Sequence, residues 1–367
     1  MTLSTIPTRA LSEQGINFRN LIINGDMSIA QRGTSVSTIT SGGYKTLDRF
    51  NIDINSAGTW TMSQSTTVPS GQGFATSLKM DCTTSDASLS ASDYLIVRTL
   101  LEGQNLQQLK FGTSSAESLT LSFWVRSNKT GTYAVWFYAD VGNKSFSKTY
   151  TIDSVDTWEK KTITINGDTA SSFSNNNSIG LRINWYLAAG TTYTSGTLPT
   201  DWQTDSNGDR AVGQVNLADN TANEWYITGV QLEVGTSASD FEFLPYDVNL
   251  RRCQRYYEIL GYDGGSGNAL ATAMKRATTV AQGSWVFKVD KRTNPTLSYI
   301  GDVTDFRVHD CNGGNLTGSS ISGNGTPGKT STWIGLNLSS AGLDQTPCLI
   351  YMLNNNGGAG YTADAEL

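Results

Sequence analysis

Apolar and polar residues alternate one by one along several short stretches of this chain, and turn-forming residues bound each stretch. The clearest case is SLTLSFWVRS at 118–127, in which every second residue is leucine, phenylalanine or valine. Because successive side chains of a strand point to opposite faces, this period of two predicts strands with one apolar face each. The other clear examples are residues 131–140, 160–167, 178–190 and 224–235. Strands repeated in this way predict an all-β chain whose first part is an antiparallel sandwich.

Composition agrees with this prediction and limits the partners. Only 16% of the 367 residues are charged, against about 25% in average proteins, and 37 residues are glycine. The net charge of −6 argues against nucleic acid as a partner, because a phosphate backbone is bound by clustered lysine and arginine. No run of 18 apolar residues is present, so we expect no membrane insertion.

Three regions are expected along the chain. Residues 1–19 form a polar N-terminal arm without the basic start and apolar core of a signal peptide, so we expect synthesis without export by the usual route. Residues 20–246 form the sandwich, whose first strand should run into a sharp turn at the sequence Asn-Gly-Asp, 24–26. Residues 247–367 form a second, smaller β-domain.

Proline 245 marks the boundary between the two domains, and the sequence after it predicts a short helix within 247–257, with Asp247 as its N-terminal cap. The second domain is expected to contain strands near 284–290, 295–301, 331–338 and 347–353. The glycine- and serine-rich stretch at 313–331 is expected to be a loop.

Several motifs resemble those of bacteriophage tail-fibre and receptor-binding virion proteins, in the same order along the chain. They are NLIINGDMSIAQRG, YKTLDRFNID, SLTLSFWVRS, DTWEKKTITINGD, WYITGVQLEVG, PYDVNLRRCQRYYE and the terminal YTADAEL. Residues 20–246 also resemble the jelly-roll carbohydrate-binding modules of families four and nine. The resemblance implies an antiparallel jelly-roll β-sandwich that binds glycans without cleaving them.

The same resemblance implies a place in a virion. A tail fibre or capsid appendage would be synthesised in the bacterial host cytoplasm, would contact other virion proteins through the arm at 1–19, and would bind a host-surface polysaccharide as a homotrimer. The alternative is a purely structural virion component, such as a capsid fibre, tail collar or decoration protein, with no glycan binding. A second alternative is a polysaccharide depolymerase.

Candidate binding residues come from the polar faces of three predicted strands. A sugar presents an apolar face that stacks on aromatic rings and hydroxyls that need hydrogen-bond partners. The rings would come from Trp124, Trp136, Tyr138 and Tyr186, and the hydrogen bonds from Arg126, Arg182 and Asn184. We expect all seven on one sheet face. Because aromatic residues and arginine are also enriched at protein interfaces, the same face has a second interpretation, as a packing face beneath a loop, a domain or a neighbouring subunit.

Other candidate sites are poorly matched. Asp205, Asn207 and Asp209 alternate as calcium ligands do, but glycine falls at the fourth position of the loop and no glutamate follows at the twelfth. We therefore expect a solvated turn, with no metal and no other cofactor. His309 lies two residues from Cys311 without a third group to orient the pair, and no segment presents the two carboxylates of a glycosidase. We expect no catalytic residues and no enzyme activity.

Overall fold

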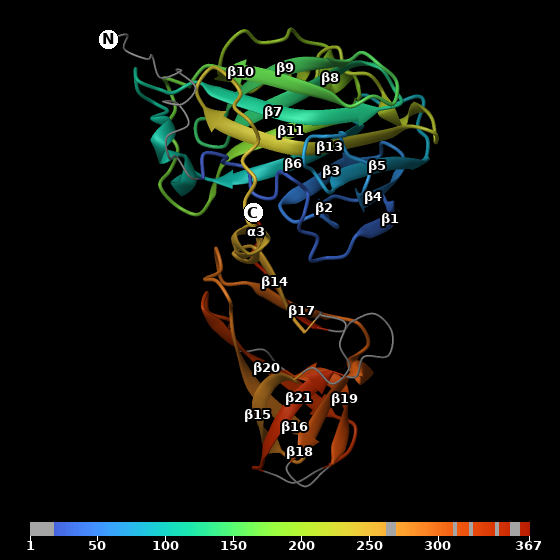
Figure 1. Ribbon diagram of the computed structural model, residues 1–367, viewed down its shortest axis with the longest axis vertical. Coiled ribbons are helices and arrows are strands. Elements are labelled where there is room, and N and C mark those ends of the chain that lie inside the picture. The colour runs from blue at the N-terminus through green and yellow to red at the C-terminus, as the bar shows by residue number, and fades with distance from the viewer. Residues whose placement is uncertain (1–17, 262–268, 311–313, 323–325, 342–344, 353–359) are drawn as a thin grey trace, which may run out of the picture. The chain divides into compact units, whose positions relative to one another are not determined.

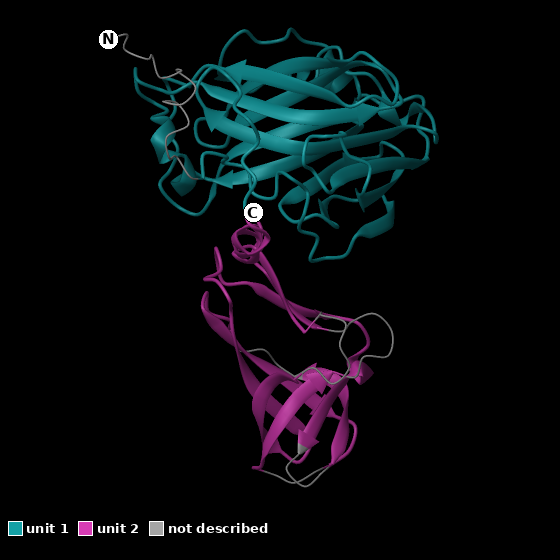
Figure 2. Ribbon diagram, in the orientation of Figure 1, with its two compact units in different colours: residues 1–244 teal, residues 245–367 magenta. Residues whose placement is uncertain are grey.

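The computed structural model describes residues 18–261, 269–310, 314–322, 326–341, 345–352 and 360–367. The chain divides into two compact units, residues 1–244 and 245–367 (Figures 1 and 2). The described part of each unit is built mostly of antiparallel strands, so the fold class is all-β. Within these residues, no helix is both long enough and apolar enough to cross a membrane.

The first unit is a β-sandwich of two sheets. The six-stranded sheet contains, in spatial order, β1 (Ser35–Ile39), β4 (Thr59–Ser65), β5 (Ser77–Thr84), β13 (Glu224–Val234), β7 (Leu119–Ser127) and β10 (Glu159–Ile165). The seven-stranded sheet contains β12 (Gln203–Thr204), β9 (Lys144–Ile152), β8 (Gly131–Ala139), β11 (Ile179–Ala189), β6 (Tyr94–Glu102), β3 (Phe50–Asn55) and β2 (Gly43–Tyr44). The chain crosses repeatedly between the sheets, as from β6 to β7 and from β7 to β8, which is the connectivity of a jelly roll.

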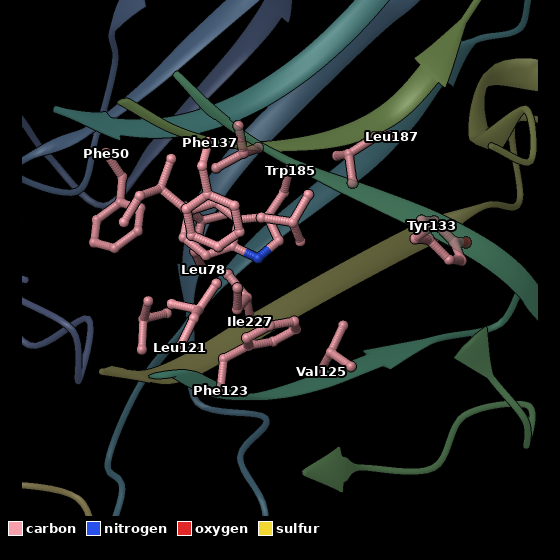
Figure 3. Close-up of a cluster of buried hydrophobic side chains, with 14 of the residues drawn as sticks. Phe50, Leu78, Leu121, Phe123, Val125, Tyr133, Phe137, Trp185, Leu187 and Ile227 are labelled. Carbon is pink, nitrogen blue, oxygen red and sulfur yellow. The ribbon is translucent and has the colours of Figure 1, made fainter. Parts of the chain in front are cut away.

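The alternating sequence pattern explains why these sheets pack together. One alternating set of side chains from each of β7, β8 and β11 faces inward, and these sets meet in one core that includes Phe123, Phe137 and Trp185 (Figure 3). Phe123 of one sheet contacts Trp185 of the other edge to face, with ring centroids 5.9 Å apart. Full burial of a large apolar side chain contributes about 1.5–3 kcal/mol, so this core dominates the stability of the sandwich.

Short helical segments join the strands of this unit. They are η1 (Gly103–Leu109), α2 (Thr191–Thr194), η2 (Asn207–Asp209) and η3 (Leu217–Asp219).

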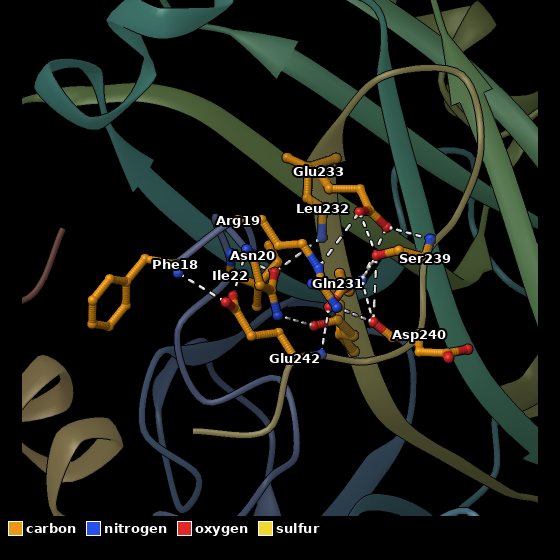
Figure 4. A network of polar contacts seen from close by, with 11 residues as sticks. Phe18, Arg19, Asn20, Ile22, Gln231, Leu232, Glu233, Ser239, Asp240 and Glu242 are labelled. Atoms are coloured by element: carbon orange, nitrogen blue, oxygen red, sulfur yellow. Dashed lines mark hydrogen bonds and ion pairs between the residues drawn. The ribbon is translucent and has the colours of Figure 1, made fainter. Parts of the chain in front are cut away.

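The segment before the Asn-Gly-Asp turn is not a strand, contrary to the prediction. Side chains bind several backbone groups here instead: Asn20 Oδ1 accepts hydrogen bonds from the N–H groups of Ile22 (2.9 Å) and Leu232 (3.1 Å). The Leu21 N–H donates to the Leu232 carbonyl at 2.9 Å. Figure 4 shows this segment beside β13 and the chain that follows it, where Glu242 accepts from the Asn20 N–H at 2.9 Å. Because side chains bind the N–H groups of Asn20 and Ile22, the single backbone bond at Leu21 is not extended into a ladder.

The turn itself depends on a close backbone approach. Asn24 has a left-handed φ of 63°, and a Cβ on residue 25 would lie 2.0 Å from the carbonyl oxygen of Val230. Only glycine fits there. Asn24 Oδ1 accepts from the Ile29 N–H at 2.9 Å, and its Nδ2 donates to the Asp48 carbonyl at 2.9 Å. The sequence therefore opens the sandwich with a docked turn that holds the first segment against β13.

The second unit contains a helix, a three-stranded sheet and a closed barrel. The helix is α3 (Tyr246–Gln254), and the sheet contains β14 (Tyr257–Leu260), β22 (Gly360–Asp364) and β17 (Thr296–Ile300). The barrel contains β15 (Ala269–Ala277), β16 (Val280–Val286), β20 (Ser331–Leu338), β19 (Asn315–Ser322), β18 (Phe306–Asp310) and β21 (Pro347–Met352), and η4 (Val303–Asp305) precedes β18. This is the smaller β-domain that the sequence predicts.

Two local predictions in this unit are wrong. Residues 315–322 form strand β19 instead of a loop, because both of its edges pair, with β18 and β20, and Leu316 and Ile321 pack against the barrel core. Helix α3 begins one residue earlier than predicted. Asp247 therefore lies in its first turn and the capping position is occupied by Pro245.

Candidate functional site

Five of the seven predicted binding residues lie together on the outer face of the seven-stranded sheet. Trp136 and Tyr138 come from β8, and Arg182, Asn184 and Tyr186 come from its antiparallel neighbour β11 (Figure 1). The register places Asn184 opposite Trp136, and Arg182 opposite Tyr138. The Trp136 ring lies 5.1 Å from that of Tyr138 and 6.4 Å from that of Tyr186, between centroids. The prediction of a shared face is confirmed for these five residues.

Trp124 and Arg126 do not belong to this face, which corrects the prediction. Both lie on β7, in the six-stranded sheet, and therefore on the other side of the sandwich. There Arg126 lies 4.9 Å above the ring of Tyr226 and pairs with Asp156 at 2.9 Å. The alternation of a strand shows which of its residues face outward, but it does not show which sheet the strand joins.

A segment of the same unit covers two of the five residues. Trp136 is 8% exposed and Tyr186 is 1% exposed, and both pack with Ala211 in a small cluster separate from the main core. The covering segment, residues 190–215, contains α2, β12 and η2. Its ends are fixed by backbone hydrogen bonds from Gly190 to Asp93 (2.8 Å) and from Val215 to Thr132 (2.9 Å). The packing-face interpretation is thus correct for these two rings.

An ion pair in the covering segment closes over Trp136. The Arg210 guanidinium lies 4.3 Å from the centre of the indole ring and pairs with the Asp205 carboxylate. Trp136 Nε1 also donates to Asp205 Oδ1 at 3.2 Å. Burial raises the pKa of Tyr186 well above its usual range, so this phenol remains neutral. The arrangement fixes the ring, and a sugar cannot stack on a ring face that a guanidinium already occupies.

The uncovered part of the face is a polar strip that we define as Asp53, Arg98, Tyr138, Asp140 and Arg182. Two half-buried ion pairs run through it: Arg98 Nη1 lies 2.5 Å from Asp53 Oδ2, and Arg182 Nε lies 2.9 Å from Asp140 Oδ2. The Arg182 guanidinium lies 5.5 Å above the ring of Tyr138, whose hydroxyl donates to Asn143 Oδ1 at 3.0 Å. Burial, with the charge of Asp140 second, raises the pKa of Tyr138. The polar strip therefore combines a neutral phenol with fixed charges of both signs.

Two buried amides lie beside the polar strip in one cross-strand row. The register places Asn51 of β3 opposite Arg98 of β6, and Arg98 opposite Asn184 of β11. Asn184 Nδ2 donates to the Trp136 carbonyl at 2.9 Å. The Oδ1 atoms of Asn51 and Asn184 and the Nε of Arg98 are buried, and none has a hydrogen-bond partner among the described residues. Unpaired buried polar atoms are costly, and this row contains three of them.

The sequence contains a signal for the residues that were not predicted. Asn51, Asp53 and Asn55 alternate with Ile52 and Ile54, which is the same period of two that identified the other strands. Placing this strand beside β6 and β11 required the sheet order, which comes from the structure.

The predicted calcium and Cys-His candidates have other environments. Asp205 pairs with Arg210, Asn207 begins η2, and Asp209 accepts hydrogen bonds from the Thr197 N–H and from Gln203 Nε2, each at 2.8 Å. No group of three or more histidine, cysteine, aspartate or glutamate residues suited to a metal ion occurs in the described ranges. His309 lies on β18, whereas Cys311 is outside the described residues.

No protein-family model and no curated protein sequence matches this chain. Among solved structures, it is similar over 59% of its length to the enzymatically active domain of tailspike protein 4 from bacteriophage CBA120, with 12% identity and a TM-score of 0.31; it spans only 22% of that protein. It is similar over 59% of its length to a putative sugar binding protein from Bacteroides thetaiotaomicron, covering 100% of that protein, with 13% identity and a TM-score of 0.31. It is also similar over 58% of its length to the CBM22-2 xylan-binding domain of Xyn10C from Paenibacillus barcinonensis, covering 97% of that domain, with 13% identity and a TM-score of 0.28.

Proposed function

We propose that the sandwich unit binds carbohydrate, without cleaving it, through the polar strip on its seven-stranded sheet. The observation that carries the proposal is the polar strip itself, which offers carboxylates, guanidinium groups and one phenol across adjacent strands. Sugar hydroxyls both donate and accept, so a surface with carboxylates, guanidinium groups and a phenol hydroxyl suits them. The rings of Tyr138 and Tyr94 border this surface, and burial and the charge of Asp53 raise the pKa of Tyr94 to about 12.

We extend the proposal to a phage tail fibre that binds a host-surface glycan, on the basis of the motif resemblance. In a homotrimer, three weak sites on one fibre would raise avidity by about 10² to 10⁴ without new contacts. The arm at 1–19 would then attach the fibre to other virion proteins. Light scattering of the purified chain tests the trimer, and a monomer at all concentrations would contradict it.

A glycan array, followed by calorimetry with the strongest ligand, tests the binding face. Arg98→Met and Arg182→Met keep the apolar stems but remove the hydrogen-bond donors of the polar strip. Because hydrogen bonds to charged groups contribute about 1.5–3 kcal/mol, each change should weaken binding by about tenfold or more. Arg126→Met is the matched control, since Arg126 is also half-buried and paired with carboxylates, but on the six-stranded sheet.

The Arg126→Met control should bind the ligand within about twofold of the unmodified chain, because substitutions at distant sites without shared partners act independently. Equal losses in all three variants would place the binding elsewhere. An array without any ligand for a folded protein would favour the purely structural virion component. One observation already points that way: each arginine of the polar strip is paired with a carboxylate of its own chain.

A further inference from the structure

A hollow of about 630 Å³ lies on the barrel of the second unit, over β15, β16 and β20. Its outward-facing lining includes Thr272, Met274, Arg276, Gln282, Ser284 and Trp333. The register explains the grouping, because Met274 pairs with Gln282 and Ser284 pairs with Trp333. Volumes of about 300–1,000 Å³ are typical of small-ligand sites. All of the described lining residues belong to the second unit, whereas the polar strip belongs to the first.

The apolar part of the lining is unusually open. Trp333 and Met274 are each 58% exposed, at strand positions that face outward from the barrel. No ring or cation contact to Trp333 occurs among the described residues, in contrast to the guanidinium above Trp136. An exposed tryptophan with an unoccupied ring face, next to the hydroxyl of Ser284, is the arrangement on which a sugar ring can stack.

Among the described lining residues, the exposed charged group is the guanidinium of Arg276. Arg276 Nη1 donates to Gln282 Oε1 at 3.2 Å, and no carboxylate of the described residues pairs with Arg276. Lys275 also lines the hollow; it is 1% exposed, and its amine has no hydrogen-bond partner within the described ranges. Because Arg276 has no acidic partner among the described residues, its guanidinium can pair with an external anion.

We propose that this hollow is a second binding site, which takes a saccharide bearing a carboxylate. The sugar ring stacks on Trp333 and contacts Met274, its hydroxyls reach Ser284 and Gln282, and its carboxylate pairs with Arg276. Arginine suits this role because its planar fork matches a carboxylate in geometry. Arg276, Gln282 and Ser284 lie beside Trp333 in the lining and offer the hydrogen-bonding groups that a sugar needs.

The test uses the full chain on an array of uronic-acid and sialic-acid glycans, each beside its methyl ester. Trp333→Ala should weaken binding of acidic glycans by about tenfold or more, because the stacking surface is lost. Arg276→Gln should weaken binding of the acids to a similar extent while leaving the esters within about twofold. Tyr246→Ala is the control, since Tyr246 is 63% exposed in the same unit and does not line the hollow. Arg182→Met separates this site from the polar strip and should leave acid binding here unchanged.

Two results would overturn the proposal. One is an array in which no carboxylate-bearing glycan binds in a manner that depends on Trp333, while the melting temperature shows that each variant is folded. The other is a change of molecular mass in light scattering when Trp333 is replaced, because the hollow would then be a contact between copies of the chain.

Discussion

Trp136 and Trp333 occupy equivalent positions in their own units and have opposite surroundings. Each side chain projects from the outer face of an antiparallel sheet, at a strand position whose alternate neighbours are mostly polar. Trp136 is 8% exposed beneath the Arg210 guanidinium, whereas Trp333 is 58% exposed in an open hollow. The difference comes from residues far away in the sequence, since Asp205 lies 69 positions after the indole that it binds. An outward-facing aromatic residue is therefore a candidate platform only when no remote segment returns to cover it.

Replacing the two tryptophans gives the largest expected effect. Trp136→Ala should lower the free energy of unfolding by about 3–5 kcal/mol, because it leaves a cavity between the sheet and the covering segment. Trp333→Ala should change it by less than about 0.5 kcal/mol, as surface substitutions do. Urea unfolding, followed by tryptophan fluorescence and circular dichroism, measures both. Similar losses of unfolding free energy in the two variants would show that the hollow is covered in solution. The surroundings of Trp136 and Trp333 would then not be opposite.

The ion pair above Trp136 gives the next largest effect. Asp205→Asn removes the charge that holds Arg210 and weakens the hydrogen bond from the indole, so we expect a loss of about 2 kcal/mol. Asp153→Asn is the control: this carboxylate pairs with Lys161 at 3.2 Å but is largely exposed, and exposed pairs contribute about 0–1 kcal/mol.

Limited proteolysis locates the effect of the Asp205 change. We expect faster cleavage within residues 190–215 of Asp205→Asn, because the ion pair helps to fix this segment over the sheet. If the segment resisted cleavage as well as in the unmodified chain, its backbone hydrogen bonds at Gly190 and Val215 would be sufficient to hold it.

The sequence predicts the strands of the sandwich better than it predicts which sheet each strand joins or which segments cover the sheets. The period of two gave the strands and their inward faces, because side-chain direction is a local property of the backbone. Sheet membership is not local, and for that reason Trp124 and Arg126 were assigned to the wrong face. The turn around Asp205 was expected to be solvated, although Asp205 pairs with Arg210, which lies over Trp136. Strand β19 was missed because its pairing with two neighbours, not its composition, makes it a strand.

The outer face of the six-stranded sheet shows a third kind of covering. Tyr226 is almost fully buried there, beneath two flexible cations: Arg126 lies 4.9 Å and Lys79 lies 5.5 Å from the ring centre. Glu224 holds both of them, at 2.6 Å from Lys79 and 3.3 Å from Arg126. Arg126 also pairs with Asp156 at 2.9 Å and Lys79 with Asp81 at 3.2 Å, but Glu224 pairs with both cations. Trp136, in contrast, is covered by a whole segment.

The smallest predicted effect is a pH dependence that arises from this carboxylate. Burial acts to raise the pKa of Glu224, but hydrogen bonds from Lys79 and Tyr226, with the nearby positive charges, outweigh it and lower the pKa below its ordinary value. A carboxyl whose pKa is lower in the folded state contributes stability above the unfolded pKa, about 4.3 for glutamate, and loses it as the pH falls through the folded pKa. Thermal melts from pH 7 to pH 3 should therefore show the unmodified chain losing its advantage over Glu224→Gln below about pH 4.3. The other carboxyl groups titrate in both proteins, so the difference between the two melting curves isolates Glu224. A difference that stayed constant across this range would show that the two cations cover Tyr226 without help from the carboxylate.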